Sequence, residues 1–165
     1  MRVALVCLLL ILAGCSPTAK PEGPACLSQS GSNELPAVDL SCFDGGTVHM
    51  RQLPGPMVIN LWASWCEPCA KELPALQRVA DRNTVKVIGV ATDDTREAAA
   101  SRAEGLGVHM PMLLDPDARL RKAIGEANLP VTLFVDANGK FTRYVGPALT
   151  DEKLASLLRE RLGVA

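Results

Sequence analysis

The feature that most constrains the fold of this 165-residue chain is a strand-like run that leads directly into two cysteines. Residues 58–62, Val-Ile-Asn-Leu-Trp, are mostly apolar and rich in β-branched side chains, which is typical of a buried strand. Cys66-Glu67-Pro68-Cys69 follows, and the next four residues favour a helix. Cys66 is therefore predicted to face the unpaired N–H groups and the positive dipole end of a helix N-terminus. That environment favours the thiolate, which is the nucleophile in disulfide exchange.

The string from Asn60 to Cys69, with Pro74 five residues later, resembles the active site of the thioredoxin superfamily. It is most similar to the TlpA/ResA/DsbE-like branch, the membrane-tethered extracytoplasmic thioredoxins. The resemblance covers about residues 34–163 and implies a thioredoxin-like α/β fold. That fold has a mixed central sheet, helices on both faces, an N-terminal β-hairpin and a central TlpA/ResA-type insertion. The resemblance implies no cofactor. A structural disulfide or half of a zinc site is the alternative, but zinc needs four ligands and no second Cys-x-x-Cys or His pair lies nearby.

Periodicity and turn residues in the rest of the chain agree with this layout. A hairpin is predicted over 42–50, with Asp-Gly-Gly as its turn. Further strands are predicted over 57–62, 85–91, 110–114, 131–135 and 140–145, and helices over 66–80 with a kink at Pro74, 96–106, 118–124 and from Thr150 onward.

The N-terminus reads as an export signal. An apolar run over residues 3–13 is too short to span a bilayer and ends in Leu-Ala-Gly-Cys15, which resembles a bacterial lipobox. We therefore expect a lipoprotein signal peptide over 1–14, lipidation of Cys15, a flexible tether over 15–33 and the thioredoxin-like domain over 34–165. The protein would be lipid-anchored at the extracytoplasmic face of the cell membrane. The alternative is an ordinary secretory signal with an incidental cysteine.

The resemblance assigns different roles to the two cysteines of the motif. Cys66 would attack a substrate disulfide, and Cys69, one turn further on, would resolve the mixed disulfide. Glu67 adds a negative charge that should raise the pKa of Cys66 and make the pair more reducing than one with a basic dipeptide. The alternative for Glu67 is an exposed acid at a helix start that has no effect on the thiol.

A proton acceptor for the second thiol is predicted one helical turn beyond Cys69. Asn60 replaces the buried aspartate of ordinary thioredoxins and cannot titrate. Glu72 resembles the acid of ResA-like proteins, and we expect it to manage protons for the cysteines if it is partly buried. The alternative is an exposed helix carboxylate.

The substrate side of the site is also implied by the resemblance. Leu129-Pro130 matches the cis-proline position of the superfamily, where the backbone contacts the active disulfide and pairs with substrate. The alternative is a plain trans proline at a strand start. Together with Trp65, Glu67 and Pro68, these two residues are the expected substrate-binding residues.

Two further cysteines remain after processing and lipidation, Cys26 and Cys42. Four cysteines allow three pairings, and adjacency selects Cys66–Cys69, which leaves Cys26–Cys42. An exported chain sits in a compartment that permits disulfides, so a structural bond is expected. A second redox pair is the alternative.

The sequence thus predicts an extracytoplasmic thiol–disulfide oxidoreductase that reduces disulfides of exported partner proteins. The resemblance implies cytochrome c or copper-site assembly proteins as substrates, and a membrane electron donor or acceptor. A formal net charge of −1 gives no indication of nucleic-acid binding. The alternatives are a disulfide-forming oxidant, a peroxiredoxin-like peroxidase and a non-catalytic copper-binding module.

Overall fold

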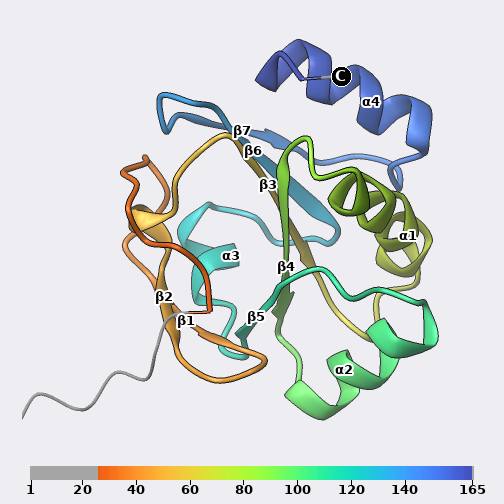
Figure 1. Ribbon diagram of the computed structural model, residues 1–165. Helices are drawn as coiled ribbons and strands as arrows, with labels where there is room; N and C mark the ends of the chain where they lie inside the picture. Colours follow the sequence, from red (N-terminus) through yellow and green to blue (C-terminus); the bar gives the residue numbers. More distant parts are fainter. Residues whose placement is uncertain (1–25, 165) are drawn as a thin grey trace, which may run out of the picture.

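The structure is a computed structural model that describes residues 26–164 (Figure 1). The predicted signal peptide, the lipidated Cys15 and the first part of the predicted tether lie outside the described residues. Within residues 26–164, no helix has the length and apolar character needed to cross a membrane.

A mixed sheet of seven strands forms the centre of the described part of the chain, in the order β2-β1-β5-β4-β3-β6-β7. The central strand β3 pairs in parallel with β4 and antiparallel with β6, and the hairpin β1–β2 joins through β5. The strands are β1 (Asp39–Cys42), β2 (Thr47–His49), β3 (Met57–Trp62), β4 (Lys86–Thr92), β5 (Met112–Asp115), β6 (Val131–Val135) and β7 (Phe141–Tyr144).

Helices cover both faces of this sheet, as predicted. In the described chain they are α1 (Glu67–Arg82), α2 (Arg96–Gly105), α3 (Arg119–Ala123) and α4 (Asp151–Leu162), with a 3-10 turn η1 (Met50–Gln52). Figure 1 shows α1 and α4 next to each other and α3 apart from them. Because side chains alternate along a strand, β3 contributes to two cores. Val58 and Trp62 pack with α1, α2 and α4, whereas Met57, Ile59 and Leu61 pack with α3.

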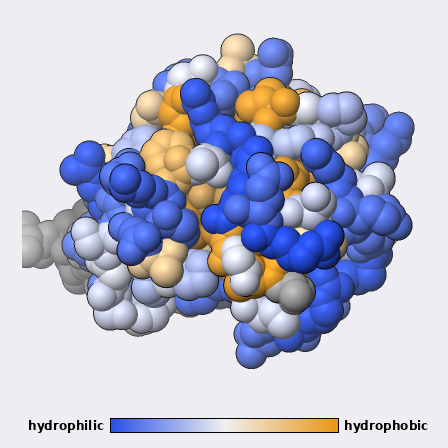
Figure 2. Space-filling model, turned by 90° about the horizontal axis from the view of Figure 1, so that it is seen from above, coloured by the Kyte–Doolittle hydropathy of each residue, from blue (hydrophilic) through white to orange (hydrophobic). Residues whose placement is uncertain are grey.

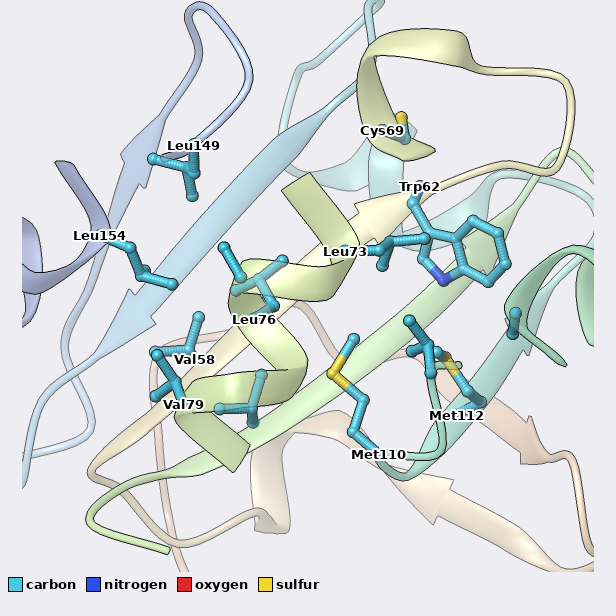
Figure 3. Close-up of a cluster of buried hydrophobic side chains, with 14 of the residues drawn as sticks. Val58, Trp62, Cys69, Leu73, Leu76, Val79, Met110, Met112, Leu149 and Leu154 are labelled. Atoms are coloured by element: carbon cyan, nitrogen blue, oxygen red, sulfur yellow. The ribbon is translucent and has the colours of Figure 1, made fainter. Parts of the chain in front are cut away.

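The core beneath α1 anchors the segment that carries the cysteines. Figure 3 shows Leu73 and Leu76 of α1 pointing toward Trp62 and Val58 of the sheet. All four side chains are fully buried, and each contributes about 1.5–3 kcal/mol relative to exposure. The start of α1 is therefore fixed against the end of β3.

Most element boundaries agree with the prediction to within one or two residues, and the strands 57–62 and 131–135 agree fully. The helix predicted from residue 66 begins at Glu67, because Cys66 is its N-cap residue. Pro74 lies inside α1, which continues as one helix to Arg82. Asn83 then ends the helix with a left-handed backbone, φ 52°.

Residues 26–33, which belong to the predicted tether, contact the rest of the described chain. Cys26 is bonded to Cys42 of β1, and Leu27 is buried. The backbone N–H of Gly31 donates to Gln52 at 2.9 Å. The Ser- and Gly-rich composition predicted a flexible tether. That prediction could not include these contacts, because the partners of residues 26–33 lie in distant segments that local composition does not reveal.

The surface seen from above is mostly hydrophilic, with hydrophobic side chains in separate small areas (Figure 2). Among the described residues, the large hydrophobic side chains that stand exposed are Trp65 and Val145, at 58% and 50%. Trp65 directly precedes the cysteine motif, so the surface beside the two cysteines carries an exposed aromatic side chain.

Candidate active site

Cys66 and Cys69 form a disulfide at the N-terminus of α1, with their sulfur atoms 2.06 Å apart. Cys66 has an extended backbone, and its Sγ accepts a hydrogen bond from the Cys69 N–H at 3.3 Å. Cys66 is 4% exposed and Cys69 is fully buried, so a reagent from solvent reaches Cys66 first. The predicted position of Cys66 between a strand and a helix is confirmed. The helix N-terminus there stabilises a thiolate on Cys66 after reduction.

The two residues before Cys66 are bonded to the turn that follows β4. The Ser64 N–H and Oγ donate to the two carboxylate oxygens of Asp94 at 2.5 and 3.0 Å. The indole N–H of Trp65 donates to the Asp93 carbonyl at 3.0 Å. Asp93 has a left-handed backbone, φ 54°, which is uncommon for a residue other than glycine. Thr95, the next residue along the chain after Asp94, is the N-cap of α2, and its side chain accepts a hydrogen bond from the Ala98 N–H.

The Leu129–Pro130 peptide bond is cis, as predicted. The register of the central sheet explains its position relative to the disulfide. Val131, the first residue of β6, pairs with Leu61 near the end of β3. The cis bond therefore lies at the end of the sheet where the chain turns toward Cys66. Leu129 is partly buried and packs against both hydrophobic cores.

A second cis bond, Gly55–Pro56, was not predicted from the sequence. It lies just before β3, at the opposite end of that strand from the cysteines. A β-carbon at Gly55 would lie 2.0 Å from the Asp136 carbonyl oxygen, so this close approach requires glycine. The Pro-Gly-Pro sequence there was a usable signal for a tight connection.

Glu67 is exposed and forms an ion pair with Arg102 of α2. The two side chains meet at 2.9 Å, and 74% of the Glu67 side chain and 35% of the Arg102 side chain is exposed. From the sequence alone, Glu67 is an isolated negative charge beside the Cys66 thiolate. Because Arg102 lies 35 residues away in sequence, its compensating charge could not be foreseen.

Glu72 of α1, three residues after Cys69, is completely buried, and both of its carboxylate oxygens are hydrogen-bonded. Its Oε1 accepts from the Asn60 side-chain amide at 2.6 Å, and its Oε2 accepts from the Leu149 N–H at 3.0 Å. Asn60 also donates to Thr132 Oγ1 at 3.0 Å. Glu72 thus joins α1, β3, β6 and the segment before α4 in one buried polar network. The alternative of an exposed helix carboxylate is excluded for Glu72.

Burial raises the pKa of Glu72 above its ordinary value of 4.5, because the charged form loses its hydration. The hydrogen bonds from Leu149 and Asn60 act in the opposite direction but more weakly. The side-chain oxygen of Asn60 is buried and has no partner. If the Asn60 amide rotates, this oxygen can accept a hydrogen bond from protonated Glu72, so the network accommodates both protonation states.

The remaining two cysteines lie outside this site. Cys26 is exposed, Cys42 is 1% exposed, and their Cα atoms are 6.1 Å apart across the disulfide. The pair borders a groove of about 540 Å³ between the β1–β2 turn, α2 and the segment before β5. Neither cysteine is at a helix N-terminus, so neither has the thiolate-stabilising environment of Cys66.

Across residues 26–164 no three His, Cys, Asp or Glu side chains are grouped so that they would hold a metal ion.

A disulfide at the start of a helix that follows the central strand, with a cis-proline at the same end of the sheet, is the arrangement of a thioredoxin-like thiol–disulfide oxidoreductase. Known proteins of similar sequence agree. The thiol-disulfide oxidoreductase ResA of Bacillus subtilis (strain 168) is 27% identical over 131 residues, 77% of this chain and 73% of that protein. ResA of Geobacillus thermodenitrificans (strain NG80-2) is 26% identical over 158 residues, 93% and 90% of the two chains. The chain belongs to the AhpC/TSA family, whose model matches residues 32–144.

Solved structures give the same result for the fold. Mycobacterium tuberculosis (MTB) dsbF has a TM-score of 0.69 at 27% identity, over 76% of this chain and 98% of that chain. A thio-disulfide isomerase from Thermus thermophilus has a TM-score of 0.63 at 27% identity, over 82% of this chain and 98% of that chain. The predicted thioredoxin-like fold and the resemblance to the TlpA/ResA/DsbE-like branch are confirmed.

Proposed function

We propose that this thiol–disulfide oxidoreductase reduces disulfides of exported partner proteins through the Cys66–Cys69 dithiol. The observation that carries the proposal is the asymmetry of the pair at the start of α1. Cys66 is the N-cap residue and is slightly exposed, whereas Cys69 is buried behind it. In the reduced protein, the Cys66 thiolate attacks a partner disulfide and releases one partner thiolate. Cys69 then attacks the mixed disulfide, which frees the second partner thiolate and forms the Cys66–Cys69 bond.

The reducing direction is supported by the charge next to the nucleophile. Glu67 is the acidic residue of the first turn of α1, and a negative charge there disfavours the Cys66 thiolate. A less stable dithiol form is a stronger reductant. Arg102 offsets part of this charge, so the predicted effect is smaller than for an unpaired acid.

Glu72 supplies the proton acceptor for the second step in this proposal. Cys69 must lose its proton before it can attack, and Asn60 cannot accept one. Glu72 follows Cys69 by three residues, so the two side chains share one helix face. Its raised pKa brings the carboxyl closer to the range where proton exchange with a thiol is efficient.

Trp65, Glu67, Pro68, Leu129 and Pro130 are the proposed substrate-binding residues. The exposed face of Trp65 offers apolar contact area next to Cys66. Backbone at the cis bond would pair with an extended segment of the partner, as the family resemblance implies.

We further propose that the protein works outside the cytoplasm, bound to the membrane through a lipid on Cys15. The support is the lipobox-like sequence and the Cys26–Cys42 bond, since persistent disulfides are typical of exported proteins. Cytochrome c or copper-site assembly proteins are the proposed partners. A membrane protein is the proposed electron donor.

Trapping tests the function directly. Cys69→Ser should hold partners as mixed disulfides on Cys66, because the resolving thiol is missing. Cys66→Ser is the matched control and should hold none. The trapped complexes are separated without reductant and identified by mass spectrometry. A Cys69→Ser protein that traps no exported protein, or traps the same set as Cys66→Ser, would contradict the proposal.

A further inference from the structure

We propose that Arg121 is a positioning residue for thiol–disulfide exchange and a determinant of how polypeptide substrates fit. It links the two chain segments that flank the disulfide, Ser64–Trp65 and residues 127–130. The inference rests on the function proposed above, because it concerns substrate fit at the same pair of cysteines.

The first segment is fixed through the turn at Asp93 and Asp94. Three hydrogen bonds connect this turn to Ser64 and Trp65. The left-handed backbone of Asp93 is the kind of strained conformation that persists at functional sites only where surrounding contacts determine it. The Asp93 N–H supplies one such contact by donating to the Asp115 carbonyl at 3.0 Å.

Arg121 connects this turn to the second segment. Its Nη2 lies 3.4 Å from the Asp93 carboxylate, and its Nη1 donates to the Ala127 carbonyl at 2.5 Å. Ala127 lies three residues before the cis-proline. The side chain of Arg121 is 14% exposed and that of Asp93 is 57% exposed, so solvent screens this ion pair from the Asp93 side and the Ala127 bond carries most of the link.

The base of Arg121 is itself fixed. The fully buried carboxylate of Asp115 accepts the backbone N–H groups of Arg119 and Leu120 at 2.7 and 3.0 Å. These bonds fasten the first turn of α3 to the end of β5. Arg121 therefore projects from a rigid element, and its guanidinium sets the distance between Asp93 and Ala127.

Arginine suits this position because its planar group presents donors in two directions. Without it, both segments keep their own strand attachments but lose the link between them. A polypeptide that contacts Trp65 and the cis-proline backbone together depends on their spacing. The reaction of a small disulfide that contacts only Cys66 does not depend on this spacing. Since a misplacement of about 1 Å can cost much activity, the effect should be selective for large substrates.

The test compares insulin with a small aromatic disulfide, 5,5′-dithiobis(2-nitrobenzoic acid), as substrates of the reduced protein. Arg121→Met keeps the apolar stem and removes both polar contacts. It should raise the KM for insulin about tenfold, the loss expected for one charge-assisted hydrogen bond, with kcat retained. The rate with the small disulfide and the pKa of Cys66 should stay at the wild-type values. Arg121→Lys, which keeps the charge beside Asp93, should recover part of the KM.

Arg119→Met is the matched control, because Arg119 lies on the same helix but donates to the Asp39 carbonyl of β1. It should leave the insulin KM unchanged. Asp93→Asn tests the Arg121–Asp93 ion pair from the side of Asp93, whose side chain is exposed, so the substitution is less of a risk to folding than one at Arg121. Asn also tolerates the left-handed backbone at this position. It should raise the insulin KM, and the double variant with Arg121→Met should raise it no further.

The outcomes separate this inference from the proposed function. An insulin KM for Arg121→Met equal to that of Arg119→Met, or an equal loss with both substrates, would overturn the positioning role. Additive effects of Asp93→Asn and Arg121→Met would also overturn it. If the wild-type protein reduces neither substrate, the proposed function is what fails, and the positioning role fails with it.

Discussion

Replacing Glu72 by glutamine removes a buried titratable group and keeps nearly the same shape. Glu72 is fully buried, and burial raises its pKa above 4.5. The folded protein therefore binds this proton more tightly than the unfolded chain does. The stability that Glu72 contributes is complete below pH 4.5 and is lost as the pH rises through the raised folded-state pKa. A glutamine side chain has no such dependence.

The size of the effect follows from proton linkage. Between pH 4.5 and the folded-state pKa, the free energy of unfolding of the wild type should fall by up to about 1.4 kcal/mol per pH unit relative to Glu72→Gln. No reduction for solvent screening applies, because the side chain has no exposed surface. The rotated Asn60 amide lets the side chain of the Glu72→Gln variant keep its contacts, so the two proteins should differ little at the acid end.

Urea unfolding of the oxidised proteins from pH 4 to pH 8 measures this difference. Oxidised cysteines do not titrate, and the other ionisable groups are common to both proteins. After reduction, thiolate absorbance should give a lower Cys66 pKa in the variant wherever Glu72 is ionised, and resolution of mixed disulfides should be slower. Parallel stability curves over this pH range would refute the raised pKa. Superimposed thiol titrations together with equal resolution rates would refute the proton-transfer role.

Three further predictions concern the rest of the chain. Replacing both Cys26 and Cys42 by Ala should lower the free energy of unfolding in urea by about 3 kcal/mol, the entropic value for a loop with a sequence separation of 16. The active-site thiol should stay as reactive as before, and loss of that reactivity would indicate a redox role for the pair. Cys15→Ala should leave the protein soluble or unprocessed, and complete membrane partitioning of a cleaved variant would exclude lipid anchoring. Gly139→Ala should lower the melting temperature more than Gly45→Ala. Both glycines have a positive φ, but only at Gly139 would a β-carbon lie 2.4 Å from the Ser32 carbonyl oxygen. Equal thermal shifts would contradict the packing of residues 26–33.

The elements with strong local signals could be predicted from the sequence. Apolar runs rich in β-branched residues defined β3 and β6, and the last helix was predicted from Thr150, whose Oγ1 accepts the Lys153 N–H at the start of α4. The cysteine motif then placed Cys66 at a helix start. These features depend on residues within one turn or one strand, where local physics decides the outcome.

The contacts that complete the site could not be predicted, because they join segments far apart in sequence. Arg102 reaches Glu67 across 35 residues, and Leu149 reaches Glu72 across 77 residues. The bond from Trp65 to the Asp93 carbonyl depends on the left-handed backbone of Asp93, which the sequence does not reveal. One sequence carries no information on which charged side chains meet across the fold.

The equilibrium reduction potential of the Cys66–Cys69 pair tests the central claim most directly. It is measured on the mature domain by equilibration with glutathione or dithiothreitol, with Cys26 and Cys42 followed separately by alkylation and mass spectrometry. A reductant of exported proteins should lie below about −200 mV, more negative than protein disulfide isomerase at about −180 mV. A value near that of DsbA, about −120 mV, would contradict the reducing function and identify the pair as an oxidant.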